Sequence, residues 1–153
     1  MKRIICIGNR YHPEDDAGAL VYERLARMRL PADVEVIDGG LGGLDLLRFV
    51  EGAGRVVFVD AAAGGPRGAM AVWTADEIER QTPDAYGHAA GLAYLLSAAR
   101  IAADGLLPEM LILGLAPAPD GDAVRTAADL CLSLAAEGSG AVREPAAACG
   151  ASR

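Results

Sequence analysis

The chain has 153 residues, of which 52% are apolar and 23% are charged, and its formal net charge at neutral pH is −7. This length suits one domain with a single substantial core, and the composition is too apolar for a disordered chain. The negative charge argues against non-specific nucleic-acid binding, which needs clustered lysine and arginine.

Cysteine usage and the start of the chain bear on the cellular compartment. Cys6, Cys131 and Cys149 are far apart and form no CxxC pair, so we expect neither a disulfide framework nor a cysteine-built metal site. The opening MKRIICIGN is too short for a signal-peptide core, and no apolar run reaches membrane-spanning length. We therefore expect a cytoplasmic protein with no membrane and no nucleic-acid partner.

Apolar runs alternate with amphipathic segments along the chain. The apolar runs predict strands at residues 3–7, 33–40, 55–65, 68–78 and 109–118. The continuous Val/Phe run in RVVFVD is typical of a central parallel strand, whereas the alternating DVEVIDGG favours a place near a sheet edge.

Helical periodicity fills the intervals between these strands. It predicts helices at residues 17–30, 43–50, 88–103 and 122–137, with a loop at 81–87. Alternating strands and helices indicate a three-layer α/β/α sandwich with a mostly parallel sheet of about five strands. We expect a single domain over 1–137 and a mobile tail over 138–153, where the sequence is small and aperiodic.

Reactive side chains follow the carboxyl ends of the predicted strands, where open α/β sheets bind ligands. Three acids, Glu14 to Asp16, follow the first strand; Asp38 and Asp60 end later strands; and His88 opens the long helix. Two carboxylates and one imidazole form a plausible site for a divalent ion such as zinc or nickel. A bound cation would relieve the repulsion between clustered carboxylates.

Each of these residues also has a purely structural interpretation. Asp15 or Asp16 can cap the first helix, Asp60 can close a strand, and His88 can simply begin a helix. Asp38 is a good turn former, and the GGLGG turn at 39–43 is either a tight turn or an anion-binding nest. The convergence of the three side-chain types at strand ends favours the metal site.

Other catalytic templates are missing from the sequence. No GxSxG, HExxH or P-loop pattern occurs, and no Ser, Cys or Thr stands beside a base. Cys6 lies inside a predicted strand and is expected to pack, and His12 is expected to be a solvated loop residue.

Four segments in order resemble the hydrogenase maturation proteases, from residue 3 to about 135. The first is an apolar strand followed by Gly8-Asn9 and then by Asp15 and Gly18. The others are DGGLGGLDLL at 38–47, VVFVDA with Asp60, and His88-Ala89-Ala90-Gly91-Leu92 at the start of a helix. The chain departs from the family pattern in the bulky RYHPE stretch at 10–14 and in Leu41, where the family commonly has threonine.

The resemblance implies an endopeptidase that removes the C-terminal extension from the large-subunit precursor of a nickel–iron hydrogenase. It implies that Asp15, Asp60 and His88 contact nickel, which the substrate supplies, and that zinc or cadmium can occupy the same site in vitro. Water activated by the ion or by a carboxylate, Asp15 or Asp38, would be the nucleophile. The glycine-rich turn, with Gly39, Gly40 and Gly42, would contact the substrate.

Two rival functions remain open from the sequence. One is a non-proteolytic accessory protein that uses the same three residues to bind metal or to escort the large subunit. The other is a small-molecule hydrolase or phosphorylase in which the GGLGG turn holds an anion.

Overall fold

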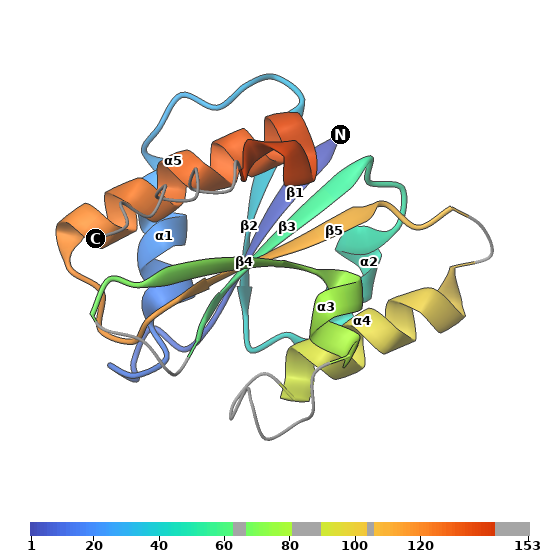
Figure 1. Cartoon of the computed structure of the whole chain (residues 1–153), viewed down its shortest axis with the longest axis horizontal. Helices are drawn as coiled ribbons and strands as arrows, with labels where there is room; N and C mark the ends of the chain where they lie inside the picture. Colours follow the sequence, from blue (N-terminus) through green and yellow to red (C-terminus); the bar gives the residue numbers. More distant parts are fainter. Residues whose placement is uncertain (63–66, 81–89, 104–105, 143–153) are drawn as a thin grey trace, which may run out of the picture.

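Five strands form one sheet in the computed structural model, which describes residues 1–62, 67–80, 90–103 and 106–142 (Figure 1). The strand order is β2-β1-β3-β5-β4. Strands β2, β1, β3 and β5 pair in parallel, and β4 runs antiparallel to β5 at the edge. The bounds are Lys2–Ile7 for β1, Val34–Gly40 for β2, Arg55–Ala61 for β3, Met70–Thr74 for β4 and Glu109–Leu115 for β5.

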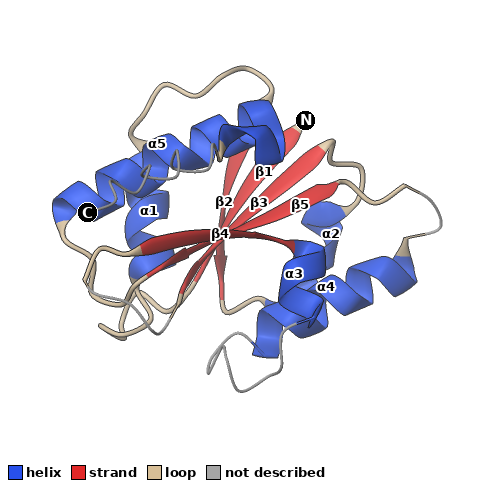
Figure 2. Ribbon diagram, in the orientation of Figure 1, coloured by secondary structure: helices blue, strands red, loops and turns tan. Residues whose placement is uncertain are grey.

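Helices cover both faces of this sheet (Figure 2). One face carries α1 (Ala17–Ala26) and α5 (Gly121–Glu137), and the other carries α2 (Leu47–Val50), α3 (Ala75–Arg80) and α4 (Ala90–Ala102). Two short 3-10 turns, η1 (Gly43–Leu46) and η3 (Gly138–Ala141), precede α2 and follow α5. The predicted three-layer α/β fold with a mostly parallel sheet is confirmed.

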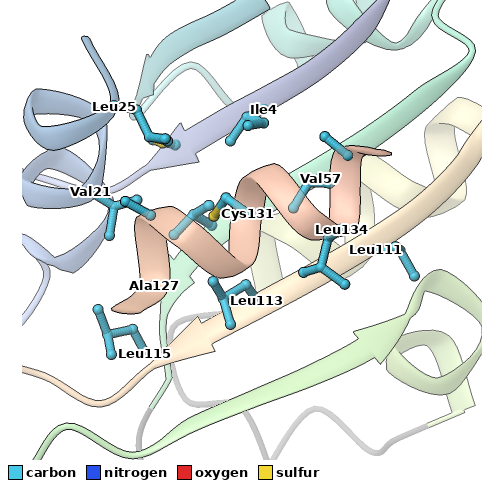
Figure 3. Packing of buried hydrophobic residues seen from close by; sticks show 14 of the residues in the cluster. Ile4, Val21, Leu25, Val57, Leu111, Leu113, Leu115, Ala127, Cys131 and Leu134 are labelled. Carbon is cyan, nitrogen blue, oxygen red and sulfur yellow. The ribbon is translucent and has the colours of Figure 1, made fainter. Parts of the chain in front are cut away.

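The central strand β3 is buried on both sides, as its continuous apolar run predicts. Val57 and Val59 pack beneath α1 and α5, while Val56 and Phe58 pack beneath α4, and all four are 0% exposed. Figure 3 shows Val57 on the α5 side of the sheet, together with Leu111, Leu113 and Cys131. Burial raises the pKa of the Cys6 and Cys131 thiols, so both cysteines pack as small apolar residues.

The segment 68–78, predicted to be a single strand, is divided in the structure. Strand β4 ends at Thr74, and a capping box begins α3, because the Thr74 hydroxyl accepts from the Glu77 amide while Glu77 accepts from the Thr74 amide at 2.7 Å. The prediction was therefore wrong for Ala75–Ile78. Helix α1 also stops at Ala26, before the predicted end at residue 30, because the amides of Arg27 and Met28 tighten the turn by bonding carbonyls three residues back.

The end of α5 is fixed to the amino-terminal edge of the sheet. Arg55 donates to the carbonyl oxygens of Ala135 and Ala136 and pairs with Glu109, which also accepts from the Ser139 amide. The segment from 138 onward, predicted to be a tail, therefore begins as a turn packed on the domain. Residues 143–153, with Cys149, lie outside the described residues.

Helix α1 lies close to β1 because residue 18 is glycine. A Cβ atom at Gly18 would stand 2.0 Å from the Ile7 carbonyl oxygen and 2.8 Å from its carbon, a separation that real Cβ contacts do not show. The backbone cannot absorb such an overlap without moving the helix. Gly18 therefore sets how near the start of α1 comes to the end of β1.

We predict that Gly18→Ala destabilises the protein by at least about 3 kcal/mol, at or above the usual cost of overpacking, because a backbone atom is displaced. Gly121→Ala is the matched control, because it also adds a methyl group in the first turn of a helix but meets no atom within 4 Å. The control should change stability by less than about 1 kcal/mol. Urea unfolding of both variants measures this, and equal midpoints would contradict the prediction.

Candidate active site

The Gly8-Asn9 pair closes the loop that carries Asp15. Gly8 has φ of +148°, and a Cβ there would meet the Asp15 carbonyl oxygen at 2.4 Å. The Asn9 amide donates to that same oxygen at 2.8 Å. The pair therefore allows the chain to return on itself and fixes the backbone of Asp15 against the end of β1.

The neighbouring Asp16 occupies the N-cap position of α1 but makes no capping hydrogen bond with its side chain. Its Oδ1 atom is buried and has no hydrogen-bond partner among the described residues. The alternative interpretation, in which Asp15 or Asp16 caps the helix through its side chain, therefore finds no support at Asp16. Asp15, by contrast, lies on a cleft.

Asp60 lies near the end of β3 in apolar surroundings. Its Oδ1 accepts from the Ala61 amide at 2.8 Å, and Trp73, Leu92 and Ile112 line a small void beside it. Burial, opposed by the Ala61 hydrogen bond and assisted by the negative charge of Asp15, raises the pKa of Asp60 from 3.8 to about 7. At neutral pH this carboxyl group is therefore partly protonated and partly ionised.

Asp15 and Asp60 line the same cleft of about 220 Å³ at the carboxyl edge of the sheet. Its remaining wall is almost wholly aliphatic and comes from the end of β1, the turn after β2 and the first turns of α4: Ile7, Leu41, Gly43, Leu46, Gly91, Leu92 and Leu95. The structure thus brings two of the predicted ligands together in an apolar pocket, where a cation between them would be weakly screened.

Asp38 has a different environment from the other two aspartates. Its Oδ2 accepts from the Arg10 guanidinium at 2.5 Å, and its Oδ1 accepts from the Gly40 amide at 3.2 Å. Sequence reasoning missed Arg10, because no local pattern joins residues 28 positions apart. The polar stretch after Asn9 was the only sequence feature that could have indicated a partner for Asp38.

The glycine-rich turn is tied to the loop that carries Asp15. The Gly40 carbonyl oxygen accepts from the Gly8 amide at 3.0 Å, and the Gly42 amide donates to the Gly39 carbonyl at 2.9 Å. A Cβ atom at Gly39 or at Gly42 would meet the Leu46 side chain, at 3.4 Å and 3.0 Å respectively. Of this turn, Leu41 and Gly43 line the cleft, rather than the three predicted substrate-binding glycines.

The third predicted ligand, His88, lies outside the described residues. It precedes by two positions the start of α4, whose Gly91 and Leu92 line the cleft. Within the part of the chain that the structure describes, no group of three or more His, Cys, Asp or Glu side chains is arranged to hold a metal ion. The two-carboxylate pair is therefore the described part of the predicted site.

A second cleft of similar volume lies at the other end of the strands, between α2 and the end of α4. Its wall is mostly aliphatic, with Leu47, Val50 and Leu107, and Glu51 is its one acidic residue. It lacks the paired carboxylates of the first cleft.

None of the described helices is both long and apolar enough to cross a membrane.

Taken together, the fold and the cleft define an α/β protein with paired carboxylates at the carboxyl edge of its sheet. Comparison with family models matches residues 19–127 to the hydrogenase maturation protease family. The match covers most of the chain, and the chain belongs to this family. As a member of this family, the chain is a peptidase.

The chain also resembles solved structures of hydrogenase maturation peptidases. An endopeptidase HycI from Escherichia coli has 24% identity and a TM-score of 0.69 over 88% of this chain and 90% of that one. A hydrogenase 2 maturation peptidase from a Thaumarchaeota archaeon has 27% identity and a TM-score of 0.57 over 86% and 95%. The maturating endopeptidase HybD from E. coli has 23% identity and a TM-score of 0.66 over 86% of each chain. No curated protein matched significantly.

The raised pKa of Asp60 predicts how the stability of the metal-free protein depends on pH. The folded state binds this proton more tightly than the unfolded state, so the free energy of unfolding should fall as pH rises from about 4 to about 7. At about 1.4 kcal/mol per pKa unit the loss is on the order of a few kcal/mol. Asp60→Asn should remove this slope and raise the melting temperature at pH 8.

Thermal unfolding between pH 4 and pH 8 measures both effects. Asp129→Asn, an exposed position on α5, is the control and should leave the slope unchanged. A slope that survives in Asp60→Asn would assign the pH dependence to another group.

Proposed function

We propose that this protein is an endopeptidase that removes the C-terminal extension from the nickel-loaded precursor of a nickel–iron hydrogenase large subunit. The observation that carries the proposal is the pairing of Asp15 and Asp60 in one cleft of a chain that belongs to the hydrogenase maturation protease family. Both residues occupy the positions that the family resemblance assigns to metal contact.

Nickel in this proposal belongs to the substrate, and the cleft recognises it. Asp60 is costly to ionise beside Asp15, and a divalent cation between the two carboxylates turns that repulsion into attraction. His88 supplies the third, nitrogen ligand. An O,O,N set with open positions suits nickel and also accepts zinc or cadmium in vitro.

When the cleft holds the nickel ion of the precursor, it also positions the peptide segment next to that ion. Once the carboxylates grip the nickel of the precursor, the cleavable segment stays at the cleft, and hydrolysis becomes effectively intramolecular. The aliphatic wall of Ile7, Leu46 and Leu92 limits access of bulk water to the pair. The ion itself supplies Lewis acidity toward the attacking water or the scissile carbonyl.

Two carboxylates are proposed for proton transfer from the water. Asp15 lines the cleft, and the loop closed by Asn9 fixes its backbone. Asp38 stands outside the cleft lining and must exchange its contact with Arg10 for the water before it acts. Backbone groups of the turn at Gly39, Gly40 and Gly42 would hold the peptide beside these carboxylates.

Substitution of any of the three ligands should abolish processing while the protein stays folded. Asp15→Asn, Asp60→Asn and His88→Ala each remove a contact that holds the nickel of the precursor, so we expect at least about a hundredfold loss of cleavage, as for a misplaced reacting group. Mass spectrometry of the precursor's C-terminus measures the product, and circular dichroism checks the fold. Asp129→Asn should process normally.

The same assay separates the proposal from its rival. Wild-type protein should shorten the nickel-loaded precursor and leave the nickel-free precursor intact. Binding of the loaded precursor without shortening would instead indicate a non-proteolytic accessory protein. Normal cleavage by any of the three variants would discredit the site.

The role of Asp38 can be tested by substituting Asp38 and, separately, its partner Arg10. If Asp38 acts as general base, Asp38→Asn should lower kcat by about 10²- to 10⁴-fold and abolish the acidic limb of the pH–rate profile. Arg10→Lys keeps the positive charge and should retain most activity. A loss of less than tenfold in Asp38→Asn would leave Asp15 as the base.

A further inference from the structure

Three exposed apolar side chains lie on the two segments that form one side of the cleft. Tyr11 is 89% exposed, Leu41 is 73% exposed and Leu44 is 44% exposed. Tyr11 belongs to the loop that carries Asp15; Leu41 and Leu44 belong to the turn and η1, whose Leu41, Gly43 and Leu46 line the cleft. These three residues are called the rim below.

Other large apolar side chains that are exposed in the described part of the chain lie elsewhere. Met1 and Val142 stand at its ends, Tyr94 lies on α4 between the cleft-lining Leu92 and Leu95, and Ile101 and Leu106 lie at and beyond the end of that helix. Isolated exposed residues of this kind are ordinary on a protein surface, whereas apolar residues gathered beside a site mark an interaction surface.

The two segments of the rim are held together by specific contacts. Arg10, next to Tyr11, pairs with Asp38, and the Gly8 amide bonds the Gly40 carbonyl beside Leu41. Within the loop, the Asn9 side chain accepts from the Tyr11 amide at 3.0 Å. The backbone of the two rim segments is thus held in place before any partner binds, which lowers the entropy lost on binding.

The cleft alone is too small to select a protein. Its volume of about 220 Å³ lies below the roughly 300–1,000 Å³ typical of pockets for drug-sized ligands. It has room for an ion and one or two side chains, whereas a specific protein complex buries about 800 Å² on each partner. Selection of a folded substrate therefore needs surface next to the cleft.

We infer that the rim is the docking surface for the folded substrate and binds an apolar patch next to the cleavable segment. This inference rests on the proposed function and adds the surface that decides which precursor is accepted. Leu41 belongs both to the rim and to the cleft lining, so a polypeptide whose metal reaches Asp15 and Asp60 lies next to the rim. Tyrosine is well suited to such a role because it offers a large contact area with few rotatable bonds.

The test compares the rim with equally exposed residues elsewhere. The rim variant is Tyr11→Ser with Leu44→Gln, two positions that do not line the cleft; the matched control is Ile101→Gln with Leu106→Gln, which are 86% and 102% exposed. With the nickel-loaded large-subunit precursor as substrate, the rim variant should raise KM by about tenfold and leave kcat within about twofold. The control should change neither value.

Equal KM values for the rim variant and the control would overturn the inference, as would a fall in kcat at constant KM, which would assign the rim to the chemical step. Sedimentation of the enzyme alone tests a second copy as the occupant: a wild-type dimer that the rim variant disrupts would also overturn it. If wild-type protein binds the precursor without cutting it, the proposed function fails, and calorimetric Kd values of the same two variants still decide the role of the rim.

Discussion

Two carboxyl groups that share one partly buried cleft repel each other, and burial disfavours the charge on Asp60 in particular. The apolar core offsets this unfavourable free energy, because the residues of β3 before Asp60 are apolar and buried on both faces of the sheet. In the proposed function, a divalent cation between the two carboxylates would relieve this repulsion.

Backbone features, more than side-chain packing, bring Asp15 to this cleft. Gly18 lets α1 approach β1, and Gly8 together with Asn9 turns the chain so that Asp15 lies beside the end of the same strand. The contact between Arg10 and Asp38 then joins this loop to β2. The position of Asp15 is therefore fixed largely by Gly8, Asn9 and Gly18, which carry none of the proposed chemistry.

The sequence was sufficient for the fold and for the position of Asp15 and Asp60 at the carboxyl ends of the strands. Apolar runs predicted β1, β3 and β5, because burial on both faces leaves a continuous pattern, and Asp60 followed from its place at a strand end. The start of α3 was missed because its capping box at Thr74 and Glu77 lies inside a strand-like run. The partners of Asp38 and the difference between Asp15 and Asp16 depend on contacts across the fold, which local patterns do not encode. His88 stays a prediction.

The contacts of Arg55 with the end of α5 lie at the opposite end of the strands from the cleft. They hold the end of α5 at the amino-terminal ends of the strands, close to the start of the chain (Figure 1). There the Met1 carbonyl accepts from the Gly54 amide. The cleft opens at the other edge. A protein immobilised through a tag ahead of Met1 would therefore present its carboxylate pair to the solution, an orientation suited to capturing single precursor molecules from the medium.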